Sequence, residues 1–280
     1  MTTTATLGRF HYLESLPPGV SSSAARPRGA AGEVRGTLVL IHGFPLSAHM
    51  WDPQRSLAER GWRVVAPSLR GFDGTAANPV AESVDDFAGD IIDFLEALHI
   101  EDPVIGGLSM GGYITFALFR HRPGVVRGMI LADTRAQGDA PEAAEGRTRM
   151  RAAVLERGSA VAADEMLPKL VCDATRGRKP EVVEQLRRMI VSTSRETIAG
   201  AITALRTRPD ATPVLREIHC PTLIIVGDQD ALTPPHFSED MQRGIRGSEF
   251  VVIPDAGHMS NMEQPADFNA AVARFLDHNV

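Results

Sequence analysis

The stretch from Val104 to Tyr113 constrains this chain more than any other part of its sequence. The apolar run VIGGL leads into Ser109, and a helical pattern follows, so that the pattern G-x-S-x-G spans Gly107 to Gly111. A strand-to-helix turn this sharp strains the backbone of its serine and exposes the hydroxyl. Both glycines are needed because a Cβ atom would clash where strand and helix approach each other. The stretch therefore predicts a nucleophilic serine at a helix N-terminus, where partial positive charge stabilises developing negative charge.

Strands and helices alternate on both sides of this turn. Continuous apolar runs predict buried strands, because a parallel sheet covered on both faces has no polar side. The runs predicted to be buried lie at 37–41, 62–66 and 221–226. Further strands are predicted at 104–106, 126–132 and 249–253, with an edge strand at 10–14. Helical patterns lie at 50–60, 83–98, 110–122 and from 265 onward. The alternation predicts an α/β fold whose mostly parallel central sheet has helices on both faces.

The alternation stops between about 137 and 212. Four helical patterns fill this region: 141–157, 159–170, 180–191 and 194–206. The region contains no Phe, Tyr or Trp. Residues 1–135 and 213–280 are therefore predicted to form two parts of one core, with residues 136–212 inserted between them as a helical unit.

Loops that follow the predicted strands carry the candidate catalytic residues. Such loops converge on one edge of the sheet, because ligands bind beyond the carboxyl ends of parallel strands. A serine nucleophile needs a base, and the base needs an acid that holds its tautomer and stabilises its charge. His258, after the last predicted strand, is the candidate base, since the pKa of histidine lies near 7. Asp230 is the preferred acid because its longer loop lets it reach the histidine, and Asp228 and Asp133 remain alternatives.

With the order Ser, Asp, His along the chain, the sequence strongly resembles the α/β-hydrolase fold family. The resemblance covers nearly all of the chain outside the insertion. It rests on HGFP at 42–45, GLSMG at 107–111, Gly227-x-x-Asp230 and Gly257-His258. It implies that the inserted helices form a cap over the active site, and that the reaction needs neither a metal nor an organic cofactor.

The resemblance also implies an oxyanion hole. Its two donors would be the backbone N–H groups of Met110 and Phe44. The side chains of Phe44 and Pro45 would line the substrate pocket. His42, in the same loop, would brace it by hydrogen bonding and take no part in proton transfer.

Particular residues favour some branches of this family over others. Haloalkane dehalogenases and epoxide hydrolases use an aspartate where this chain has Ser109, and dehalogenases have a tryptophan where it has Met110. The sequences IHGFPL at 41–46 and GLSMGG at 107–112 are similar to those of 3-oxoadipate enol-lactonases and of cofactor-free haloperoxidases. We therefore expect a serine hydrolase that cleaves a carboxylic ester or lactone through an acyl-enzyme. A perhydrolase, a carbon–carbon bond hydrolase of aromatic degradation and a non-enzymatic ligand receptor are the alternatives.

Two further residues are predicted to contact the substrate. Met259 follows the candidate base. Arg135, just past a strand end, could bind a carboxylated substrate, and the alternative is an exposed arginine that caps the start of the insertion. A net charge of −6 gives no reason to expect nucleic acid or an anionic membrane as partner. We see no signal peptide and no apolar stretch of about 20 residues that would span a membrane. The sequence therefore predicts a cytoplasmic protein that acts on a small molecule, and it specifies no oligomeric state.

Overall fold

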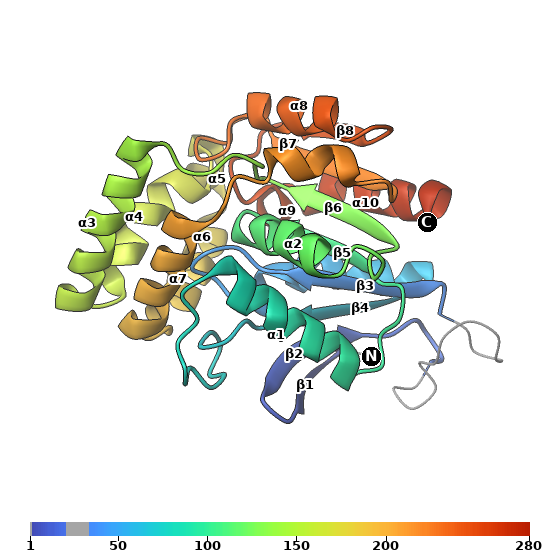
Figure 1. Cartoon of the computed structure of the whole chain (residues 1–280), viewed down its shortest axis with the longest axis horizontal. Helices are drawn as coiled ribbons and strands as arrows, with labels where there is room; N and C mark the ends of the chain where they lie inside the picture. The colour runs from blue at the N-terminus through green and yellow to red at the C-terminus, as the bar shows by residue number, and fades with distance from the viewer. Residues whose placement is uncertain (1, 21–33) are drawn as a thin grey trace.

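An eight-stranded sheet organises the part of the chain that the computed structural model describes, residues 2–20 and 34–280 (Figure 1). The strands follow the order β1-β2-β4-β3-β5-β6-β7-β8. The pairs β1–β2 and β2–β4 are antiparallel, and the remaining pairs are parallel. The strands are β1 (Thr2–Leu7), β2 (Phe10–Ser15), β3 (Gly36–Ile41), β4 (Trp62–Pro67), β5 (Val104–Leu108), β6 (Gly128–Ala132), β7 (Thr222–Gly227) and β8 (Glu249–Ile253).

The centre of the sheet explains why its strands appear as apolar runs in the sequence. Every residue of β4, β5, β6 and β7 is buried, and nearly all of their side chains are apolar. The two polar exceptions have partners: Arg63 of β4 pairs with Glu14 at 2.7 Å, and Thr222 of β7 donates to the carbonyl oxygen of Cys220 at 3.0 Å. The six strands predicted for the core are present. The strand predicted at 10–14 is present as β2, but its predicted place at the edge of the sheet is wrong, because β1 lies outside it. The sequence of β1, TTTATL, carries no alternation that would have indicated it.

Helices cover both faces of the sheet. Figure 1 shows α1 (Val84–Ala97) and α2 (Met110–His121) in front of it and α10 (Pro265–Asn279) behind it. The long 3₁₀ segment η2 (Ala48–Arg60) packs against α10. The shorter elements are η3 (Thr212–Glu217), α8 (Pro235–Gly244) and α9 (Ser260–Glu263).

Five helices lie between β6 and β7 and gather at one end of the sheet (Figure 1). They are α3 (Pro141–Arg157), α4 (Ala160–Leu170), α5 (Asp173–Arg178), α6 (Pro180–Val191) and α7 (Arg195–Thr207). The sequence missed α5, because its six residues are too few for a helical repeat. Residues 17–36 are rich in Pro, Gly, Ser, Ala and Arg, a composition that predicts a surface loop, and most of them lie outside the described residues. Among the described helices, none combines the length and apolarity that crossing a bilayer requires.

Candidate active site

Ser109 occupies the turn between β5 and α2 in a backbone conformation that only a tight turn imposes. Its φ is 55° and its ψ is −113°, which is strained for a residue with a Cβ atom. A Cβ atom on Gly107 would lie 2.2 Å from the carbonyl oxygen of Gly111, and one on Gly111 would lie 2.2 Å from that of Ile41. The two glycines are therefore required by the closeness of α2 to β5 and β3.

The end of β6 holds this turn in place. The Ser109 N–H donates to the carbonyl oxygen of Ala132 at 3.0 Å, and Thr134 Oγ1 donates to the carbonyl oxygen of Ser109 at 2.9 Å. The Ser109 side chain is left to face the neighbouring cavity, and among the described residues it makes no hydrogen bond with His258. The serine is thus fixed through its backbone while its hydroxyl remains available.

His258 and Asp230 form a buried pair beside this serine. His258 Nδ1 lies 2.8 Å from Asp230 Oδ2, and the two residues are 2% and 3% exposed. Asp230 also accepts hydrogen bonds from the N–H groups of Leu232 and Thr233 and from Thr233 Oγ1. Four donors around one carboxylate fix its orientation. Because Nδ1 faces the aspartate, Nε2 is the ring nitrogen that can exchange a proton with a substrate.

The other two candidate acids have different partners. Asp228 Oδ1 accepts the N–H of Ala256 and so links two loops. Asp133 Oδ1 accepts the N–H of Gly227 at 2.8 Å, and its Oδ2 accepts Ser260 Oγ at 2.5 Å. Of the three aspartates, Asp230 is the one that the structure brings to His258.

The pKa values of the two buried aspartates, Asp230 and Asp133, are shifted in opposite directions. Burial would raise the pKa of Asp230, but the charge of His258 and the hydrogen bonds from His258 and Thr233 lower it overall. Burial raises the pKa of Asp133 well above its ordinary value, and the nearby Asp230 charge raises it further. Asp230 is therefore the carboxylate that stays ionised, as stabilisation of a charged histidine requires.

His42 braces the loop after β3, as the resemblance implied. Its Nδ1 lies 3.0 Å from the carbonyl oxygen of Gly43, and its Nε2 accepts the N–H of Leu69 at 3.0 Å. Complete burial lowers the pKa of His42 to about 4, so the ring is neutral at pH 7. Its two nitrogens are thus occupied by loop contacts.

Two backbone N–H groups near Ser109 are free to bind an anion. Met110 begins α2, so its N–H has no preceding helical turn to bond. The N–H of Phe44 makes no hydrogen bond among the described residues. Met110 directly follows Ser109, and Phe44 lies in the loop after β3, next to Gly43, which approaches Ser109, and lines the same cavity as Ser109. Two such N–H groups beside a serine are the arrangement expected of an oxyanion hole.

A cavity of about 730 Å³ opens beside Ser109 and His258. Phe44 and Arg135, both predicted to contact the substrate, line it. Pro45 and Met259, predicted alongside them, are absent from its lining and are buried. Met259 is fully buried in the hydrophobic core, and its N–H donates to the carbonyl oxygen of Leu170 at 3.0 Å.

The sequence prediction missed most of the cavity wall that the insertion supplies. Helix α3 presents one face to the cavity, and α4 adds charged side chains and Met166. The lining residues of α3 are Ala143, Gly146, Arg147, Arg149, Met150, Ala153 and Arg157. Most of them recur at steps of three, four or seven, so a helical projection of α3 was the signal that could have found them.

Glu263 joins the insertion to the loop that carries His258. Its Oε1 accepts the N–H of Gly257 at 2.8 Å, and its Oε2 accepts that of Cys172 at 2.9 Å. A Cβ atom on Gly257 would lie 2.6 Å from the Cys172 nitrogen, so the two segments are in direct contact. The buried carboxylate thus holds two chain segments together next to the candidate base.

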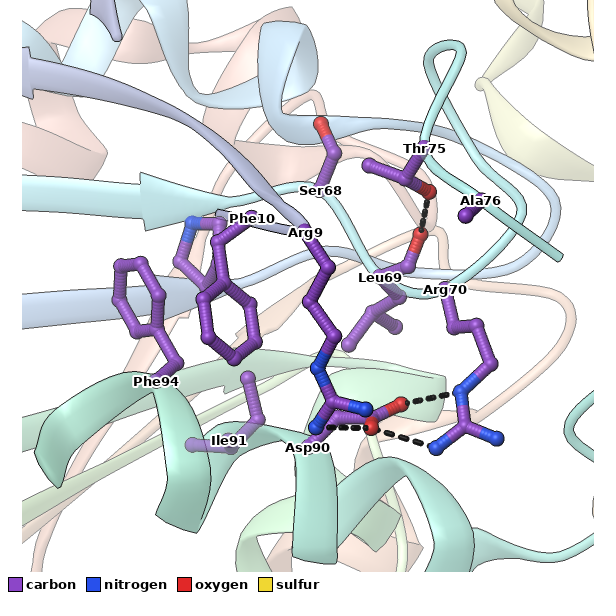
Figure 2. A pocket seen from close by; sticks show the side chains of 11 residues that line it. Arg9, Phe10, Ser68, Leu69, Arg70, Thr75, Ala76, Asp90, Ile91 and Phe94 are labelled. Atoms are coloured by element: carbon purple, nitrogen blue, oxygen red, sulfur yellow. Dashed lines mark hydrogen bonds and ion pairs between the residues drawn. The ribbon is translucent and has the colours of Figure 1, made fainter. Parts of the chain in front are cut away.

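A second, much smaller cavity lies between β4, α1 and the start of β2 (Figure 2). Its volume is about 30 Å³, and it shares no lining residue with the first. Figure 2 shows Arg9 and Arg70 both directed at Asp90, at nitrogen–oxygen distances of 3.1 and 2.5 Å. Its main charges are therefore satisfied within the protein.

Comparison with known proteins assigns the family. Residues 36–265 match the family model described as alpha/beta hydrolase fold. The match covers most of the chain, from β3 to the start of α10, and includes the turn at Ser109 and the His258–Asp230 pair. The chain therefore belongs to the α/β-hydrolase fold family, and its sheet topology agrees with that assignment.

Particular relatives are esterases and enol-lactonases. The chain is 28% identical over 265 residues to 3-oxoadipate enol-lactonase 2 of Acinetobacter baylyi, which covers 94% of the chain and 96% of that protein. It is similar to the structure of a thermophilic esterase from Thermogutta terrifontis, with a TM-score of 0.86, 37% identity and coverage of 99% and 97%. For the enol-lactonase of Burkholderia xenovorans LB400, the TM-score is 0.84, the identity 25% and the coverage 99% and 100%.

Proposed function

We propose that the protein hydrolyses carboxylic esters or lactones through an acyl-enzyme on Ser109. The observation that carries the proposal is the buried 2.8 Å contact between His258 Nδ1 and Asp230 Oδ2, at a cavity that both Ser109 and His258 line. The enol-lactonase and esterase names of its relatives support it. In this proposal residues 136–212 act as the cap over the cavity.

The proposed reaction uses each of these groups in turn. His258 Nε2 takes the proton from Ser109 Oγ as that oxygen attacks the ester carbonyl. The N–H groups of Phe44 and Met110 hold the oxyanion, each worth about 3 kcal/mol. His258 then protonates the departing alcohol, and later activates the water that releases the acid. Asp230 stays ionised and holds the imidazole.

The test measures hydrolysis of 4-nitrophenyl acetate, butyrate and octanoate. We expect the wild type to cleave the short esters and Ser109→Ala to lose about 10³-fold or more in kcat/KM. Ser56→Ala, which changes an exposed serine outside the cavity, is the matched control and should keep wild-type activity. A fluorophosphonate reagent should add its mass to a peptide containing Ser109.

Two results would contradict the proposal. Full activity of Ser109→Ala would show that another group is the nucleophile. Absence of turnover by the wild type on all three esters and on simple lactones would remove ester hydrolysis as the function, and carbon–carbon substrates would be tested next.

A further inference from the structure

The cavity beside Ser109 is rich in cationic side chains. Five of them line it, against two carboxylates, Asp139 and Glu165. The cationic residues are Arg135, Arg147, Arg149, Arg157 and Lys169. The excess is positive although the whole chain carries a net charge of −6. Clefts with one sign of charge raise the local concentration of ligands with the opposite sign.

The buried carboxylate of Asp139 forms ion pairs with three arginines, two of which line the cavity. Asp139 Oδ1 lies 2.6 Å from Arg135 Nη2 and 2.8 Å from Arg208 Nη2, and Asp139 Oδ2 pairs with Arg147. The side chains of Asp139 and Arg208 are 1% and 2% exposed. One negative charge therefore faces three positive charges where little solvent can screen them.

The side chain of Arg208 contacts other residues of the protein and does not reach the cavity. Its guanidinium lies 4.2 Å from the centre of the Tyr113 ring, and it donates to the carbonyl oxygens of Leu205 and Gln137. It is absent from the cavity lining.

Arg135 has donors that no protein group uses. Among the described residues, only its Nη2 has a hydrogen-bond partner, and its buried Nε has none. The guanidinium lies 5.0 Å from the centre of the Phe237 ring, so its plane is held by packing. A buried donor without a partner is unfavourable, and a guanidinium fork matches a carboxylate through two parallel hydrogen bonds.

We propose that this cavity binds esters or lactones that carry a carboxylate, held by Arg135 and Arg147, while the scissile carbonyl lies at Ser109. The exposed Arg149, Arg157 and Lys169 attract such substrates toward the cavity. This inference rests on the proposed ester hydrolysis and names its substrate class.

The experiment compares matched charged and neutral esters. On the acyl side, the mono-4-nitrophenyl esters of adipic and suberic acid are compared with 4-nitrophenyl hexanoate and octanoate. On the alcohol side, 4-carboxyphenyl hexanoate is compared with phenyl hexanoate. The readout is the ratio of kcat/KM for the charged ester to that for its neutral partner, at low and at high salt.

We expect the wild type to prefer the charged ester in at least one pair by about 10-fold or more, with a smaller ratio at high salt. Arg135→Gln and Arg147→Gln should each reduce that ratio by about 10-fold. Arg243→Gln, which removes an exposed arginine of α8 outside the cavity lining, is the control and should keep the wild-type ratio. The pair that shows the preference identifies the side of the ester that carries the carboxylate.

The inference would be overturned by a wild-type ratio at or below one in every pair, or by a ratio that both cavity variants leave unchanged. In either case neutral esters would still be cleaved, so the proposed hydrolysis would stand. Failure to cleave any ester, charged or neutral, would instead count against the proposed function itself.

Discussion

The buried histidine of the loop after β3 makes the stability of the protein depend on pH in a way that can be calculated. His42 has a pKa of about 4 in the folded chain, against an ordinary value of 6.5. The unfolded chain therefore binds the proton more readily than the folded chain. The His42 contribution to stability is fully present above pH 6.5, declines as the pH falls below 6.5, and stops declining near pH 4.

The magnitude follows from the size of this shift. One pKa unit corresponds to 1.36 kcal/mol, so the full difference amounts to about 3 kcal/mol. Between pH 7.5 and pH 5, about 2 kcal/mol of the unfolding free energy should be lost through His42 alone. The loss has a simple structural origin, because burial disfavours the charged form of the ring. In addition, Nε2 accepts the N–H of Leu69, and a proton there would displace that hydrogen bond.

The assay is urea unfolding of the wild type and of His42→Gln at pH 7.5 and at pH 5. The substitution removes loop contacts and should destabilise the protein at pH 7.5, but the difference between the two proteins should be about 2 kcal/mol smaller at pH 5. His219→Gln changes an exposed histidine and should show the same difference from wild type at both pH values. A His42→Gln difference that is equal at both pH values would refute the reasoning.

Three further predictions test other parts of the structure. Asp133→Asn should raise the thermal midpoint by about 2–4 °C at pH 8, because the raised pKa of this carboxyl makes its ionised form destabilising. For the same reason, the variant should lose less stability than the wild type as the pH rises above 4. A calorimetric midpoint equal to that of the wild type would contradict this. Gly111→Ala should cost more than about 3 kcal/mol in urea unfolding, whereas Gly89→Ala, with nothing within 4 Å of the new Cβ, should stabilise by about 0.5–1 kcal/mol. Thr233→Val should lower kcat about 10-fold in ester assays at constant protein stability, because Asp230 loses a 2.6 Å hydrogen bond.

The fold was largely predictable because its strands and helices produce strong periodic signals. Apolar runs found the parallel strands, and the helices expected at 141–157 and 180–191 have the same bounds in the structure. Elements with weak signals were missed. Strand β1 is rich in threonine with no alternation, and α5 is only six residues long.

The candidate site was predictable only in part, because its residues come from two sources of different kinds. Those at strand ends, such as Ser109 and His258, follow strands that the sequence reveals. The face of the inserted helices that lines the cavity depends on how α3 packs against α7, and no local pattern specifies that packing. Met259 shows the same limit, because its neighbour His258 lines the cavity while Met259 points into the core.

The carboxylate of Glu263 has a consequence for building chimeric proteins. It accepts one backbone N–H from the insertion, at Cys172, and two from the histidine loop, at Gly257 and Met259. A helical insertion transplanted from a relative must therefore present its own backbone N–H at the position of Cys172 and leave the space beside Gly257 empty. A grafted insertion that lacks these contacts to Glu263 and Gly257 would displace the loop of His258 even if every grafted helix folded correctly. Successful exchange of the insertion should thus depend on the few residues around Cys172, Gly257 and Glu263 more than on the helices themselves.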